Sequence, residues 1–138
     1  MELKFEVIGK FKAKQRPRFC KSGFVFTPKD TVMYENYVKN MAIQAMENQE
    51  ICEAPLEAFI TFYCEIPKSY SKKRIEAINN GLEYPTKKPD LDNLAKTILD
   101  ALNKVCYRDD SQVVFLAVKK RYGSCEKVDV LIRDISND

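Results

Sequence analysis

The stretch that decides the fold is an amphipathic segment behind a proline, and it reads Pro89-Asp90-Leu91-Asp92-Asn93-Leu94-Ala95-Lys96-Thr97-Ile98-Leu99-Asp100-Ala101-Leu102-Asn103. At about 100° per residue, its apolar side chains fall on one side of a helix and most of its charged side chains on the other. We therefore predict a helix that begins at Asp90 or Asp92 and ends near Asn103. One side of this helix packs against the core, and the opposite side is free to bind a ligand.

Shorter patterns on both sides of this segment predict further elements. Alternation at period two predicts a strand over residues 3–8, and short apolar runs predict strands over 24–26, 56–66, 112–122 and 127–133. The last two runs are separated by Gly123 and its neighbours, which is typical of a hairpin. Residues 32–48 have helical spacing, and residues 71–78 form a short basic helix that ends at Gly81. With 138 residues, no repeat and no linker, we expect a single domain over 1–138.

Composition excludes several classes of protein. The chain has no histidine, which rules out Ser-His-Asp and Cys-His catalysis, and its five cysteines show no C-x-x-C spacing. We therefore expect neither a zinc ribbon nor a disulfide framework. No apolar run approaches the roughly 20 residues of a membrane span, and the N-terminus lacks a signal-peptide pattern. We expect a soluble, cytoplasmic protein without membrane contact or organic cofactor.

The chemistry is expected in residues 88–113, where five aspartates surround a single lysine, Lys96; they are Asp90, Asp92, Asp100, Asp109 and Asp110. Two unpaired carboxylates about 4 Å apart repel by roughly 1 kcal/mol in water and about 4 kcal/mol at an effective dielectric near 20. A fold that gathers them usually supplies a cation, and oxygen ligands without histidine favour Mg²⁺, with Mn²⁺ as a substitute. A turn after the helix can bring Asp109 or Asp110 back to the helix start, and spacing alone does not choose between them.

A structural explanation of the same residues stays open. An aspartate ahead of a helix is usually a cap, and Asp92 and Lys96 have the spacing of a surface ion pair worth about 0.3–0.5 kcal/mol. If the cluster is only a cap and an ion-pair network, the protein is a non-catalytic nucleic-acid-binding module.

Basic residues concentrate near the N-terminus without any acid between them. Alternate positions are basic over residues 10–18, so an extended chain presents these charges on one face: Lys10, Lys12, Lys14, Arg16 and Arg18. We predict that this basic comb binds DNA phosphates, together with Lys72, Lys73, Lys88 and Lys96. The competing interpretation is an edge strand protected by charge. For the run Lys119-Lys120-Arg121 we instead predict the exposed end of a strand.

The motif residues resemble the RusA-type endodeoxyribonuclease family, the Holliday junction resolvases common in prophages. The matching residues are Pro89-Asp90-Leu91-Asp92-Asn93-Leu94 with Lys96, Leu99-Asp100-Ala101-Leu102-Asn103, Tyr107, and Asp109-Asp110-Ser111-Gln112-Val113. The resemblance implies a small α/β (α+β) fold, in which a mixed β-sheet has flanking helices, and a symmetric homodimer. It also implies Mg²⁺-dependent paired nicking of four-way DNA junctions in recombination and repair.

The resemblance further implies which residues act. Asp90, Asp92 and Asp110 are the expected catalytic metal ligands, with Asp109 as an additional candidate, and Lys96 is the expected catalytic or DNA-contacting base. An enzyme of the same chemistry that cuts flaps, forks or plain duplexes is the remaining alternative.

Overall fold

The computed structural model describes residues 1–13, 18–19, 25–26 and 29–135. In chain order its elements are β1 (Glu2–Ile8), β2 (Arg18–Phe19), β3 (Val25–Phe26), α1 (Lys29–Met46), β4 (Leu56–Glu65), α2 (Lys72–Asn79), α3 (Leu91–Leu102), the 3₁₀ turn η1 (Asp110–Gln112), β5 (Val113–Gly123) and β6 (Lys127–Asp134). Every helix and strand predicted from the sequence is present, with ends shifted by a few residues.

A mixed sheet with strand order β1-β6-β4-β5 forms the centre of the molecule. Strand β4 is parallel to β5 and antiparallel to β6, and β6 is antiparallel to β1. Ile60 of β4 lies beside Val118 on one side and Val130 on the other. The expected α/β class with a small mixed sheet and flanking helices is confirmed.

The predicted hairpin between the last two strands is wrong. Strand β4 lies between β5 and β6, so these two strands are not neighbours. Leu56, Ala58, Ile60 and Phe62 of β4 are almost completely buried. A buried strand needs hydrogen-bonding partners on both of its edges, and the two later strands supply them. Closeness in sequence favoured the hairpin, but burial of β4 decided the order.

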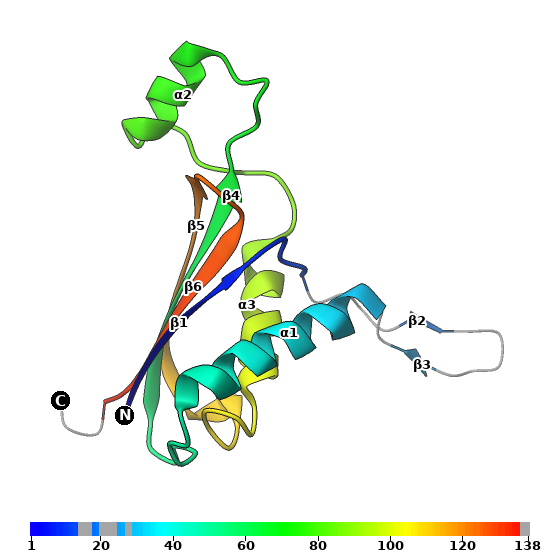
Figure 1. Ribbon diagram of the computed structural model, residues 1–138, viewed down its shortest axis with the longest axis vertical. Coiled ribbons are helices and arrows are strands. Elements are labelled where there is room, and N and C mark those ends of the chain that lie inside the picture. Colours follow the sequence, from blue (N-terminus) through cyan, green and yellow to red (C-terminus); the bar gives the residue numbers. More distant parts are fainter. Residues whose placement is uncertain (14–17, 20–24, 27–28, 136–138) are drawn as a thin grey trace.

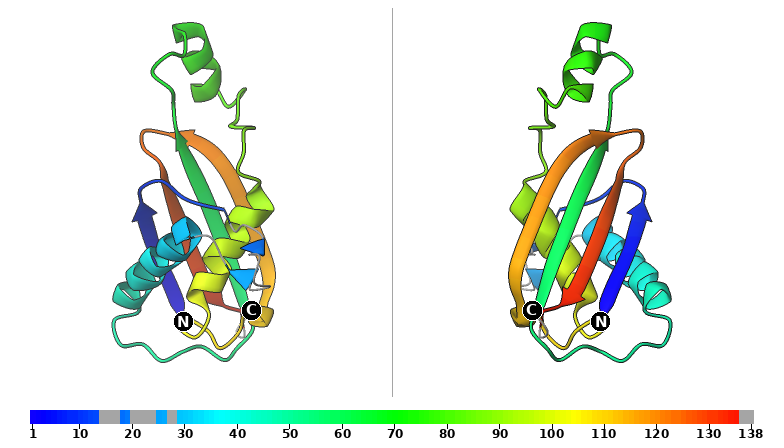
Figure 2. Two further views of the ribbon diagram at one scale, coloured as in Figure 1. Left: turned by 90° about the vertical axis from the view of Figure 1, so that its right-hand side faces the viewer. Right: turned by 90° about the vertical axis from the view of Figure 1, so that its left-hand side faces the viewer.

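Helices α1 and α3 cover one face of the sheet, and no helix of the described chain covers the other (Figure 1; Figure 2). The helix α3 buries the apolar side that the sequence predicts, namely Leu94, Ala95, Ile98, Ala101 and Leu102, together with Thr97. The Thr97 hydroxyl is satisfied because it donates to the Asn93 carbonyl at 3.1 Å. Among the described helices, none has the length and hydrophobicity that a bilayer crossing requires.

The short helix α2 stands beyond the end of the sheet and buries none of its residues (Figure 1). Ser71 caps its first turn, and Gly81 ends it with a positive φ of 72°, as predicted. The α2 lobe, residues 66–90, is fastened by polar contacts. The Arg74 guanidinium lies 3.6 Å from the centre of the Tyr70 ring, and the hydroxyls of Tyr70 and Tyr122 are 3.2 Å apart.

Candidate active site

Asp90 occupies the N-cap position of α3 but does not cap the helix with its side chain. Its backbone is extended, with φ −67° and ψ 141°, and its carbonyl accepts the first helical hydrogen bond from Leu94 at 3.1 Å. Its carboxylate makes no capping hydrogen bond. The capping explanation of this aspartate therefore fails, and its carboxylate is available to a ligand.

Asp92 and Lys96 follow on the exposed side of the same helix, one turn apart. Within the described residues, the two side chains form no ion pair with each other or with any other group. The surface ion pair considered from the sequence is therefore not formed, and both charges stand open to solvent.

The turn after α3 assigns different tasks to the two neighbouring aspartates. The Asp109 carboxylate accepts a hydrogen bond from the Ser111 amide at 3.0 Å and caps η1. Hydrogen bonds from Ser111 hold the pKa of this carboxyl below its ordinary value. Asp110, the first residue of η1, has no such engagement among the described residues.

Gln112 holds this turn in place. Its amide nitrogen donates to the carbonyls of Cys52 and Ala54 at 2.9 and 3.0 Å, and its amide oxygen accepts from the backbone of Arg108 and Asp109 at 2.8 and 3.0 Å. Through these four hydrogen bonds the side chain joins the η1 turn to the segment ahead of β4. The sequence-based prediction gives Gln112 no separate role, although an aspartate followed three residues later by glutamine is the pattern of a capping box.

Tyr107 forms a buried support behind the turn. It is fully buried, and its hydroxyl donates to the Leu99 carbonyl at 2.5 Å. Burial raises the pKa of Tyr107, and the nearby thiol of Cys106 and carboxylates of Asp110 and Asp100 raise it further. The phenol therefore stays protonated and links the end of α3 to the η1 turn.

Three of the four predicted catalytic residues, from two separate segments, line one hollow of about 560 Å³. It is lined by Leu91, Asp92, Ala95, Lys96, Leu99, Asp110, Leu116 and Val118. Helix α3 supplies Asp92 and Lys96, η1 supplies Asp110, and β5 supplies an apolar wall of Leu116 and Val118. Asp90 and Asp109 are not among the lining residues.

The donor set fits a hard divalent cation in its chemistry. Across the described residues, no three acidic, cysteine or histidine side chains lie close enough to form a ready metal-binding group. Mg²⁺, however, is commonly held by one or two carboxylates, with waters and substrate phosphates completing its octahedron. Asp92 and Asp110 supply two carboxylates at one hollow, and Asp90 precedes Asp92 by two positions. The convergence of all three carboxylates stays a prediction.

The family model for endodeoxyribonuclease RusA matches residues 9–133 of this chain. The chain belongs to the RusA family. It is also 40% identical to the uncharacterized protein YqaN of Bacillus subtilis (strain 168), over 97% of both chains. A crossover junction endodeoxyribonuclease rusA of Lactococcus phage r1t is 34% identical over 59% of this chain and 56% of its own length.

The basic residues predicted to bind DNA in this RusA-family chain fall into two groups, the N-terminal basic comb and the lysines of the α2 lobe and α3. Lys14 and Arg16 of the comb lie outside the described residues, and of Arg18 only the backbone, in β2, is described. Lys10 is exposed and Lys12 half-buried. Lys72, Lys73, Lys88 and Lys96 are all exposed, and they belong to the α2 lobe and to the helix that follows it.

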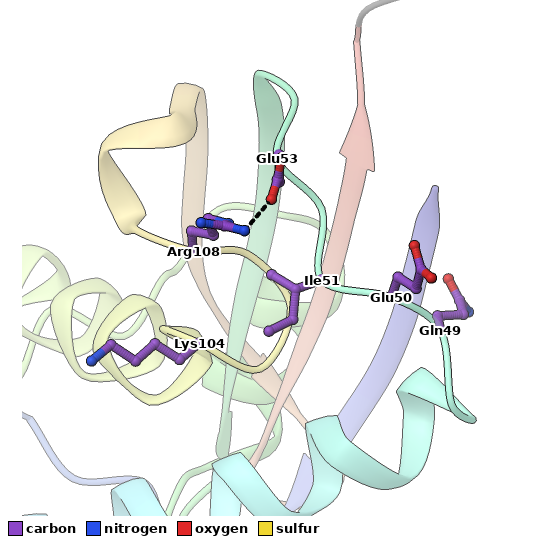
Figure 3. Close-up of a pocket in the computed structure, with 6 residues that line it drawn as sticks. All are labelled: Gln49, Glu50, Ile51, Glu53, Lys104 and Arg108. Carbon is purple, nitrogen blue, oxygen red and sulfur yellow. Dashed lines mark ion pairs between the residues drawn. The ribbon is translucent and has the colours of Figure 1, made fainter.

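A hollow larger than the one lined by Asp92, Lys96 and Asp110 lies elsewhere on the molecule. It measures about 830 Å³ and is lined by Gln49, Glu50, Ile51, Glu53, Lys104 and Arg108 (Figure 3). The ion pair between Arg108 and Glu53 neutralises two of its charges. None of the predicted site residues lines it.

Proposed function

We propose that this protein is a divalent-metal-dependent endodeoxyribonuclease that resolves four-way DNA junctions by nicking opposed strands as a homodimer, in recombination and repair. One observation carries the proposal: Asp92, Lys96 and Asp110, brought from two separate segments, line the same hollow. Membership of the RusA family supports the reaction class, and the phage relative named as a crossover junction endodeoxyribonuclease supports the substrate.

Asp92 and Asp110, with Asp90, would hold one or two Mg²⁺ ions, or Mn²⁺ in their place. When bound, such an ion lowers the pKa of a coordinated water and polarises the scissile phosphoryl group. The carboxylates would hold that ion in a fixed place and so determine where a phosphate bound to it lies. Lys96, one turn along α3 from Asp92, donates to a phosphate oxygen and offsets the charge that develops on it.

The wall formed by Leu116 and Val118 supports this role for Lys96 and the carboxylates. An apolar surface beside the scissile phosphate excludes water on that side. Interactions between fixed charges and the phosphate are stronger where water is excluded. The apolar wall therefore raises the contribution that each charged side chain of the hollow makes to catalysis.

The α2 lobe is suited to DNA by its electrostatics. Its first turn contains Lys72, Lys73 and Arg74 and no acidic residue. Cations are unfavourable at a helix N-terminus, where the dipole is positive, so these charges do not stabilise the helix. Arg74 is already paired with Glu83, at 2.9 Å between its Nε and the carboxylate. A DNA phosphate compensates Lys72 and Lys73, and this supports a path for one junction arm along the lobe towards the hollow.

Two nicks in opposed strands require two active sites related by two-fold symmetry. Helix α1 exposes the apolar side chains of Met33, Tyr37 and Ile43 in addition to the side it buries. This second apolar side supports a homodimer contact through α1.

Cleavage of a panel of DNAs tests the proposal. A four-way junction, a flap, a fork and a linear duplex, each labelled on a single strand, are incubated with the protein in Mg²⁺, in Mn²⁺ and in EDTA. We expect paired nicks in the junction, weaker cleavage of the other substrates, and none in EDTA.

Two other results of this panel contradict the proposal in different ways. Binding without cleavage in either metal would establish the non-catalytic module instead. Preferential cutting of flaps, forks or duplexes would keep the nuclease and replace the substrate.

A further inference from the structure

Lys120 of β5 makes a tether across to the segment that leads into α3. Its ammonium group donates to the carbonyl of Lys87 at 2.7 Å and to the carbonyl of Pro89 at 2.9 Å. The side chain is half-buried, whereas its neighbours Lys119 and Arg121 are exposed. The expectation that residues 119–121 form the exposed end of a strand therefore holds for two of them and not for Lys120.

This use of a lysine is unusual. Lysine side chains normally keep their charged end in water, because a hydrogen bond to one carbonyl offsets only part of the hydration free energy that is lost on burial. Here two carbonyls share one ammonium group, and hydrogen bonds from a charged donor are stronger than neutral ones. Among the described residues Lys120 has no carboxylate partner. Its contacts are thus specific to this backbone segment.

The anchored segment depends on the tether. Within the described chain, residues 86–89 make no other hydrogen bond. Pro89 lacks an amide hydrogen, so its carbonyl is the only backbone group through which it can be held. The next residue is Asp90, whose carbonyl starts α3. Lys120 therefore holds the segment that leads directly into the carboxylate-bearing end of α3.

Strand β5 joins this tether directly to the hollow. Side chains two apart on a strand lie on the same face, and Leu116 and Val118, which line the hollow, are followed on that face by Lys120. One face of one strand thus supplies the apolar wall of the site and the anchor for the segment opposite it.

We propose that Lys120 is a positioning residue of the active site. By holding the carbonyls of Lys87 and Pro89 it fixes the start of α3, and with it Asp90 and Asp92, relative to the hollow that Asp110 also lines. This proposal rests on the proposed function, because it requires that the site bind a divalent metal ion. Lys120 would change the affinity for that ion and would not contact the phosphodiester. Groups that orient metal ligands without touching the metal commonly change metal affinity by about 10- to 100-fold when removed.

The test compares Lys120→Met with Lys119→Met in the full chain. Both substitutions remove one positive charge from adjacent positions of β5, but Lys119 lies on the other face and has no partner among the described residues. Three quantities are measured: Mn²⁺ affinity from the electron paramagnetic resonance signal of the free ion, amide hydrogen exchange of residues 87–94, and junction affinity in EDTA.

For Lys120→Met we expect Mn²⁺ to bind about tenfold more weakly or worse, and exchange in residues 87–94 to accelerate. Junction affinity in EDTA should equal that of Lys119→Met. Lys120→Arg, which keeps a charged donor, should recover part of the Mn²⁺ affinity.

Equal Mn²⁺ affinity and equal exchange in the two methionine variants would overturn the proposal. So would a loss of junction affinity confined to Lys120→Met with unchanged Mn²⁺ binding, which would make Lys120 a phosphate ligand. If the wild type cleaves DNA and one of these two results is found for Lys120→Met, the proposed function stands and only the proposed role of Lys120 is refuted. A wild type that neither cleaves DNA nor binds Mn²⁺ refutes the proposed function and this proposal together.

Discussion

Asp92 and Asp110 line the same hollow, although one stands in the first turn of α3 and the other begins the 3₁₀ turn that follows this helix. The chain runs the length of α3, turns over the buried Tyr107, and returns along β5. This return path brings a second carboxylate to the hollow that the first one lines.

Asp92→Asn and Asp110→Asn should each lower single-turnover cleavage of a four-way junction by at least about 10²-fold in Mg²⁺. Each substitution keeps the shape of the side chain and removes a charged ligand. Junction binding in EDTA should be unchanged or tighter, because less negative charge faces the phosphates. Wild-type cleavage by either variant would remove that residue from the site.

Lys96→Gln should lower the cleavage rate by about 10²-fold while leaving thermal stability unchanged. The physical reason is that Lys96 pairs with no carboxylate in the described chain, so folding does not depend on its charge. Calorimetry and single-turnover kinetics on the same preparation check both halves. A lower melting temperature with normal cleavage by the folded fraction would assign Lys96 to the structure alone.

Asp109 should affect stability in a pH-dependent manner. Its carboxyl has a pKa below the ordinary value of 3.8, because the charged form accepts hydrogen bonds from Ser111. Stability from this group is therefore fully present above pH 3.8 and is lost as pH falls through the lower, folded-state pKa.

The melting temperature of Asp109→Ala relative to wild type checks this prediction between pH 7 and pH 2. The melting temperature of Asp109→Ala should lie below that of wild type by a constant amount near pH 7, and this difference should shrink as the pH approaches 2. Asp109→Asn keeps a capping oxygen that does not titrate, and it serves as the control. A deficit for Asp109→Ala that grows in acid would contradict the assignment.

Gln112→Ala should destabilise the fold by about 2 kcal/mol, because four hydrogen bonds worth roughly 0.5–1.5 kcal/mol each are removed and solvent replaces some of them. Urea denaturation measures this change. Cleavage should fall as well, since the η1 turn that carries Asp110 is no longer clasped to the segment before β4. Ser111→Ala, at an exposed position of the same turn, provides a milder comparison.

Replacing Lys72 and Lys73 together by glutamine should weaken junction binding and reduce the slope of log affinity against log salt by about 1.8, near 0.9 for each phosphate that is no longer neutralised by a lysine. Chemistry at saturating protein should persist, because the α2 lobe lies outside the hollow. Filter binding over a range of salt concentrations measures the slope. An unchanged slope would move the DNA path away from α2.

Local sequence predicted the elements and the three charged residues that line the hollow. The apolar side of α3, the end of α2 at Gly81 and the alternation in β1 all depend on residues within a few positions of one another. Hydrophobic periodicity reports these relationships directly. The motif from Pro89 to Val113 likewise contained the charged residues that line the hollow and the resemblance to the RusA family.

Tertiary structure decided the rest. Whether β5 pairs with β4 or β6 depends on which arrangement buries β4, and this involves residues far apart in the chain. The spacing of Asp109 and Asp110 did not choose between them, although the family resemblance favoured Asp110, and the fold places Asp110 at the hollow. Lys120 is a further case, because its partners belong to a segment more than thirty residues earlier. Periodicity is a property of neighbours, whereas strand order and side-chain tethers arise only when the whole core closes.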